Sequence, residues 1–221
     1  MRVAFFTILI AVGSLNAQPP RSMLMHCDNS ENLSAEVKLS KIRSFSDIQD
    51  TKTLECIFSY MDHLSMVRDV RAPPLIANYL DVPNPKLQEK QTNAPNPGHG
   101  VPLGGHYPAL IYLMMYRQDA LPVLLKTISA EPEFTLKAEN AVRAWMYIEA
   151  PNPPMGVQLL AEAAREANGT SAKTLSEAAR FATTTWQCHL LLTDCQNALS
   201  TTGQISHQEG RARRQFTHAR K

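Results

Sequence analysis

The residues best suited to chemistry lie in and beside residues 82–105, a stretch rich in Pro, Gly and Asn. His99, His106 and Glu89 offer two imidazoles and a carboxylate, which are ligands that zinc accepts. No fixed ligand spacing such as HExxH or paired CxxC accompanies them. We therefore interpret the histidines as solvated loop residues and predict no metal and no cofactor. Instead, His99, His106 and Tyr107 form a candidate partner-binding loop.

Two further groups of residues carry reactive atoms. One is a run of soft ligands that suit Cu(I): Met23, Met25, His26 and Cys27. The other places His189 beside a cysteine, as in a cysteine–histidine nucleophile pair. A disulfide would remove the thiolate from either group, so we favour gap-filling methionines and a packed histidine beside a structural bridge. No GxSxG, phosphate-binding glycine loop or paired-carboxylate motif is present, and no catalytic residue is predicted.

The sequence contains four cysteines: Cys27, Cys56, Cys188 and Cys195. Three pairings are open, and joining each cysteine to its near neighbour is favoured because it closes short loops. On one unbroken helix Cys188 and Cys195 would stand about 10 Å apart, beyond the bridging limit of roughly 7 Å. A helix break is therefore expected between them, with Thr193 and Asp194 as N-caps of a new helix. The alternative is four free, buried thiols.

Residues 1–17 have one arginine, an apolar core and a small-residue end, the pattern of a secretory signal peptide. We expect cleavage after Ala17 and a soluble protein that is secreted or periplasmic. An uncleaved amphipathic or core helix is the alternative for this segment. The polar residues 18–52 follow, and later in the chain even the apolar run 110–115 is far too short to span a membrane.

Composition predicts one compact domain, since 44% of the 221 residues are hydrophobic and only 19% are charged. Residues 201–221 lack an apolar stripe and hold five Lys and Arg side chains, so we expect a disordered basic tail. The rest of the mature chain is mildly acidic, which argues against nucleic-acid binding. A solvated tail without a partner is the favoured interpretation, and weak contact with anionic lipid or an envelope polymer is the alternative.

Apolar residues recur with helical spacing from Thr53 onward, and residues 53–200 read as a helical domain that residues 82–105 interrupt. The first pair of helices combines the stripe from Thr53 with the segment APPLIANYL. In the second, an apolar helix over 107–116 is followed by one that Asp119 caps. Residues 35–39 fit either a short strand or a frayed helix.

The third pair is a helix around Trp145 followed by one that Asn152 caps, with Pro153 at its first position. Gly169 is expected to end this second helix. A seventh helix is expected from about Thr174, where Glu177 completes a capping box. The sequence thus predicts an all-α fold of antiparallel helix pairs.

Helix pairs that recur at about 40–47 residues resemble HEAT and armadillo repeats. The segment DALPVLL over 119–125 is similar to the second helix of a HEAT unit, and residues 72–76 are a fainter echo. The resemblance covers roughly residues 53–190. It implies an irregular α-solenoid that binds a protein or peptide along one face and inherits no catalytic residues. An irregular helical bundle is the alternative fold.

Together these features predict an exported, non-catalytic interaction module with a protein or peptide partner. The competing hypothesis is an envelope or extracellular enzyme whose site lies between residues 82–105 and the helix over 107–116. A pocket around His99, His106 and Tyr107 would favour the enzyme. Asn32 and Asn168 begin glycosylation sequons that have meaning only in a eukaryotic host.

Overall fold

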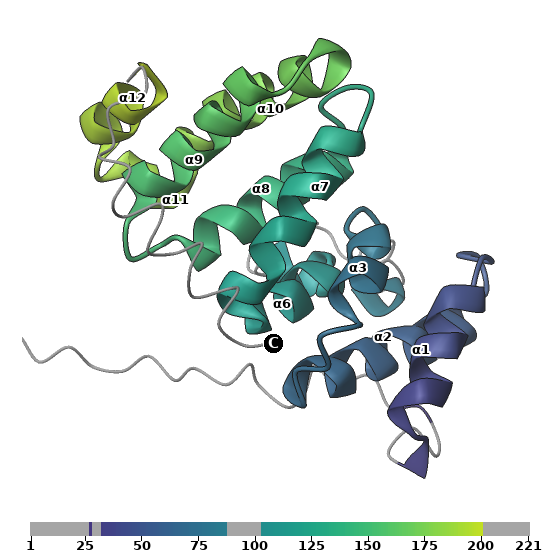
Figure 1. The fold of residues 1–221 in the computed structure, drawn as a ribbon. Coiled ribbons are helices and arrows are strands. Elements are labelled where there is room, and N and C mark those ends of the chain that lie inside the picture. The colour runs from purple at the N-terminus through teal and green to yellow at the C-terminus, as the bar shows by residue number, and fades with distance from the viewer. Residues whose placement is uncertain (1–26, 28–31, 88–102, 201–221) are drawn as a thin grey trace, which may run out of the picture.

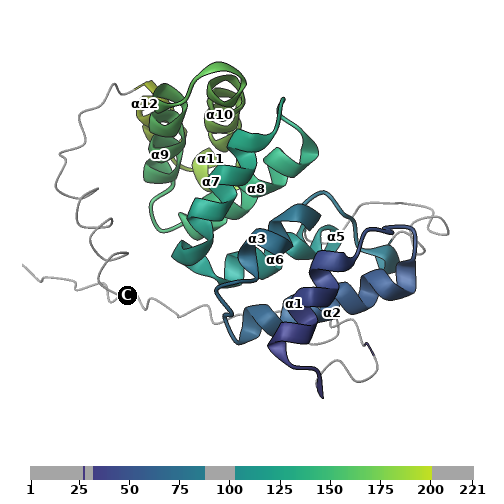
Figure 2. The same ribbon diagram turned by 45° about the vertical axis from the view of Figure 1, so that its right-hand side comes forward.

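The computed structural model describes Cys27, residues 32–87 and residues 103–200, and all regular elements within these ranges are helices. The predicted all-α class is therefore confirmed. The expected signal peptide over residues 1–17, the polar residues 18–26 and the basic residues 201–221 lie outside the described residues. Figures 1 and 2 show α1 and α2 at one end of the molecule and α9, α10 and α12 at the other. The elements are α1 (Ala35–Ser44), α2 (Thr51–Met66), α3 (Pro73–Ile76), η3 (Ala77–Tyr79), α5 (Leu103–His106), α6 (Pro108–Met115), η4 (Arg117–Ala120), α7 (Leu121–Ala130), α8 (Leu136–Ile148), α9 (Pro153–Glu166), α10 (Gly169–Ala182), α11 (Trp186–His189) and α12 (Leu192–Ser200).

The first helix, α1, settles the open choice for residues 35–39, because they are helical throughout. Ser34 caps α1 by accepting a hydrogen bond from the backbone N–H of Val37. Glu36 lies in the first turn and basic residues in the last, an arrangement that the helix dipole favours. Leu39 and Ile42 are buried on the side that packs against α2.

Helix α2 begins at Thr51, two residues before the predicted start, because Asp50 caps it by accepting from the N–H of Thr53. All six residues of the predicted stripe are buried: Leu54, Ile57, Phe58, Met61, Leu64 and Ser65. The segment APPLIANYL forms α3 and η3, with Pro73 at the first helical position. Helix α2 packs mainly against α1 and α6, and α3 packs against α6 and α1, so these two segments do not form the expected first pair.

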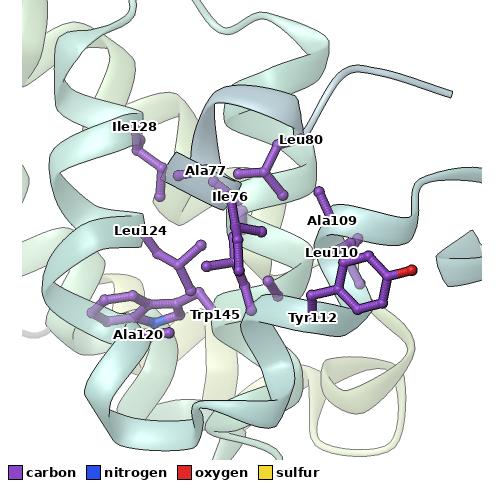
Figure 3. Packing of buried hydrophobic residues seen from close by; sticks show 14 of the residues in the cluster. Ile76, Ala77, Leu80, Ala109, Leu110, Tyr112, Ala120, Leu124, Ile128 and Trp145 are labelled. Carbon is purple, nitrogen blue, oxygen red and sulfur yellow. The ribbon is translucent and has the colours of Figure 1, made fainter. Parts of the chain in front are cut away.

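Helix α6 is the buried central helix that the sequence predicts, and it contacts both α2 and α8. In Figure 3 the side chains of Ile76, Leu124 and Trp145 meet those of α6 in one apolar cluster. The predicted cap at Asp119 is wrong. A 3₁₀ turn, η4, runs directly into α7, whose N-cap is Ala120, and Asp119 lies 3.7 Å from the Arg68 guanidinium.

Helix α9 starts as predicted, with Pro153 at its first position and the Asn152 side chain accepting from the N–H of Met155. It ends at Glu166, so Gly169 does not stop it. Gly169 is the first residue of α10, and its φ of 60° lets the chain reverse within two linking residues. The predicted start at Thr174 is also wrong, because Thr174 is buried inside α10 and its hydroxyl donates to the carbonyl of Glu131.

Both disulfides join near neighbours: Cys27 with Cys56, and Cys188 with Cys195 across a Cα–Cα distance of 6.0 Å. The expected helix break falls between α11 and α12. It lies at Leu190 and Leu191, so Thr193 and Asp194 stand inside α12 and do not cap it. His189 is exposed, which overturns its interpretation as a packed histidine.

Helices α9 and α10 form a close antiparallel pair that also contacts α7, α8 and α12. A HEAT-like solenoid stays a prediction. Repeated units would have similar connections, whereas here they vary from two residues between α9 and α10 to longer irregular segments elsewhere. No helix in the described ranges has the length and apolar character needed to cross a membrane.

Candidate functional site

A small cleft lies between the C-terminal end of α1 and the η3 turn, and we refer to it as the α1–η3 cleft. Its volume is about 200 Å³. Pockets for small molecules usually measure about 300–1,000 Å³, so the α1–η3 cleft suits one or two side chains of a larger partner. The lining residues are Ile42, Arg43, Phe45, Ser46, Ile48, Leu75, Asn78, Tyr79 and Val82.

Tyr79 fixes the shape of this cleft. Its hydroxyl donates to the carbonyl oxygens of Ile42 at 2.9 Å and Phe45 at 3.4 Å, where α1 ends. The rings of Tyr79 and Phe45 stack with centroids 6.4 Å apart, and Phe58 meets Tyr79 edge-on. Burial raises the pKa of Tyr79, so the hydroxyl keeps its proton and remains a donor. The wall of the cleft is thus positioned before any partner arrives.

Arg43 supplies the charge beside this apolar wall. It lies exposed in the last turn of α1, and no carboxylate of the described residues forms an ion pair with it. Its guanidinium can therefore pair with an acidic group of a partner without breaking an internal ion pair. Ile48, 47% exposed, extends the apolar surface on the same rim. Together these groups can hold an apolar side chain that neighbours a carboxylate.

A second group of polar residues lies between α2 and α6. Asp62 is only 8% exposed, and burial raises the pKa of its carboxyl group to about 6. Tyr112 is buried on α6, and burial followed by the negative charge of Asp62 raises the pKa of its hydroxyl. Figure 3 shows this hydroxyl pointing away from the apolar cluster. The pair places a carboxyl group that titrates near neutrality beside a phenol.

The two ends of residues 82–105 that the structure describes, 82–87 and 103–105, meet beside α6. The backbone N–H of Asn84 donates to the carbonyl of His106 at 2.7 Å, and its side-chain amide donates to the carbonyl of Gly105 at 3.2 Å. His106 and Tyr107 are half-buried at this junction. His99 and Glu89 lie outside the described residues. Within the described part of the chain, no three His, Cys, Asp or Glu side chains are grouped to hold a metal ion.

Sequence reasoning missed the residues that now stand out. Asp62 was not among the candidate residues, yet it follows Phe58 by four residues and so lies on nearly the same side of α2. That spacing was the available signal. No signal in the sequence pointed to Arg43 and Tyr79, because residues 36 positions apart meet only through the packing of α1 against α3 and η3.

Comparison with known proteins identifies no relative of this chain. No family model matches the chain, and no curated protein or solved structure matches it.

Proposed function

We propose that this protein is an exported, non-catalytic interaction module that holds a protein or peptide segment in the α1–η3 cleft. The observation that carries the proposal is the combination of a preformed apolar wall and the exposed charge of Arg43, which forms no ion pair with the described carboxylates. The occupant is a segment with a bulky apolar residue next to an Asp, a Glu or a terminal carboxylate. Export is supported by the two disulfides, since such bonds persist in oxidising compartments.

Selection from a random peptide library against the folded protein tests this proposal directly. Enriched peptides should share an apolar residue beside an acidic one. The change Arg43→Glu should weaken their binding by roughly tenfold or more, because it replaces attraction by repulsion. Ile48→Glu should weaken binding through the apolar part. Lys41→Glu is the matched control, since Lys41 is exposed in the same turn of α1 but does not line the cleft.

The proposal fails if no common motif is enriched, or if the Arg43→Glu variant binds the enriched peptides as well as the unchanged protein does. Circular dichroism on each variant establishes that the helical fold is intact. The three substituted side chains are exposed, and a glutamate in the last turn of α1 opposes the helix dipole, so we expect changes in stability within about 1 kcal/mol.

The second candidate is an enzyme with a site between residues 82–105 and the helix over 107–116. The observation that favours it lies on the α2 side of that helix, where Asp62 acts on Tyr112. A carboxyl group with a pKa near 6, such as that of Asp62, suits general acid–base chemistry at neutral pH. A panel of chromogenic ester, glycoside and phosphate substrates at pH 5 to 7 tests this candidate. Turnover that disappears in Asp62→Asn would support it, and turnover that persists in that variant would assign the activity elsewhere.

A further inference from the structure

Three consecutive leucines project from the end of the molecule opposite the α1–η3 cleft. Leu190 is 84% exposed, Leu191 is 40% and Leu192 is 46%. Leu190 and Leu191 link α11 to α12, and Leu192 is the first residue of α12. We call the segment 189–194 the leucine loop. The bridge between Cys188 and Cys195 closes this segment at its base. In both ribbon views α12 lies at the periphery, with α1 at the far side of the fold.

Such a cluster of exposed apolar side chains is unfavourable in water unless another surface covers it. The segment is held in one conformation, since the two cysteines beneath it are fully buried and α12 packs against α9. The leucines therefore do not need to be ordered when a partner arrives, and a surface that covers them gains their burial with little entropic cost.

The backbone of the leucine loop is also prepared for an apolar medium. The N–H of Leu191 donates to the carbonyl of Cys188 at 3.1 Å, and the N–H of Cys195 donates to the carbonyl of Leu191 at 2.9 Å. An unpaired backbone N–H or C=O group is strongly unfavourable in hydrocarbon, so internal pairing at the tip lowers the penalty for insertion.

The chain that follows α12 supplies the complementary charge. Residues 201–221 contain five basic residues and a single acidic one, Glu209. Helix α12 begins at Leu192 and is about 14 Å long at 1.5 Å per residue. The ten residues 201–210 can span up to roughly 33 Å, so the basic residues can reach the plane of the leucine tip. The basic residues are Arg211, Arg213, Arg214, Arg220 and Lys221.

We propose that the leucine loop inserts into an anionic lipid surface while the basic tail pairs with the lipid headgroups. A peripheral protein needs two signals for stable attachment, and shallow apolar insertion plus a basic segment provides them. A protein groove could bury the leucines as well, but it would leave the positive charge of the tail without a matching surface. The α1–η3 cleft lies at the other end of the fold and stays open in this arrangement.

The test uses residues 18–221 and vesicles of phosphatidylcholine with or without about 30 mol% phosphatidylglycerol, which sets the surface charge. Sedimentation should show binding to the anionic vesicles and little binding to the neutral ones. The triple change L190S/L191S/L192S should lower the partition coefficient by roughly tenfold or more. The double change R213A/R214A should lower it and flatten its dependence on salt.

Val70→Ser is the matched control, because Val70 is 76% exposed at a site away from α11 and α12. It should bind anionic vesicles like the unchanged protein, as should Arg43→Glu, which separates this test from that of the cleft. Circular dichroism reports the fold, and the single change Leu190→Ser serves if the triple variant is unstable.

Absence of binding to anionic vesicles overturns the inference. So does undiminished binding by the folded leucine variants, since the tail alone would then account for it. If the protein does not bind vesicles, and a protein that co-purifies with it is lost in the triple variant, the leucines bind a protein groove instead.

Discussion

The indole N–H of Trp145 donates a hydrogen bond to the carbonyl oxygen of Gly156, 3.0 Å away. The bond joins α8 to the first turn of α9, across the short link that Asn152 caps. Trp145 is 4% exposed, so this contact lies in the core and fixes how closely the two helices approach. A glycine at position 156 is what allows that approach.

We predict that Gly156→Ala destabilises the protein. A Cβ atom at this position would lie 2.9 Å from the Cβ of Glu149 and 3.0 Å from the sulfur of Met146. The resulting shift should cost roughly 1–3 kcal/mol, more than the gain in helix propensity of about 1 kcal/mol. Urea denaturation followed by circular dichroism measures the difference. Arg165→Ala, at an exposed position of the same helix, should change stability by less than about 0.5 kcal/mol.

Stability should fall as pH rises through the titration of Asp62. The folded-state pKa of about 6 lies above the ordinary value of 3.8, so between these values the folded state binds more protons than the unfolded one. The favourable contribution of Asp62 to stability is complete below pH 3.8 and is lost as pH passes 6, a change of at most about 3 kcal/mol because the carboxyl group keeps some contact with water.

Asp62→Asn removes this titration. We therefore expect the variant to gain stability relative to the unchanged protein as pH rises from 4 to 7. Above pH 7 the difference between the two free energies of unfolding should be constant. Unfolding free energies at each pH measure the difference between the two proteins, which cancels the contributions of Asp50 and Asp69, whose pKa values are lowered by hydrogen bonds. A difference that is independent of pH would mean that Asp62 titrates normally.

The two disulfides should contribute unequally to stability. In the chain-entropy account, removing the bridge of sequence separation 29 should cost about 3–4 kcal/mol, and removing the bridge of separation 7 about 2–3 kcal/mol. The variants C27A/C56A and C188A/C195A, compared by denaturation, measure the two effects. A larger loss for C188A/C195A would show that the second bridge also holds α12 against α9.

Tyr79→Phe should weaken both the fold and the cleft. The change removes the hydroxyl that donates to the carbonyls of Ile42 and Phe45, which should cost about 1 kcal/mol of stability. The wall beneath Arg43 then loses its anchor, so affinity for selected peptides should fall. Tyr147→Phe is the control, because Tyr147 is 52% exposed on α8. Equal peptide affinity in Tyr79→Phe would show that stacking with Phe45 is sufficient.

Local patterns predicted the helices well where they depend on neighbours in sequence. The stripe of α2, the burial of α6 and the Asn152 cap are each set by residues within one or two turns. The errors arose where distant contacts decide. Thr174 resembled an N-cap in the sequence, but its hydroxyl donates a hydrogen bond to the carbonyl of Glu131. Helix α10 starts earlier, at Gly169, where the chain turns with a φ of 60° that a glycine adopts readily.

The candidate site was less accessible to sequence reasoning. His106 and Tyr107 lie where Asn84 hydrogen-bonds to the chain at the end of residues 82–105. Neither residue lines the α1–η3 cleft. The cleft exists because Tyr79 reaches back to residues at the end of α1, a contact between segments that have no common periodicity. Ion pairing was equally hard to predict from the sequence. No local pattern distinguishes Arg43 from Arg71, which forms ion pairs with Glu36 and Asp69.

The order of the disulfides along the chain has a consequence for biosynthesis. Each bridge joins one cysteine to the next in sequence, so Cys56 meets only Cys27 as the chain emerges from its amino end. Cys188 and Cys195 lie far later in the chain. If each pair closes in the order in which its cysteines emerge, oxidation produces the native pairing and requires no isomerase to reshuffle wrong bonds.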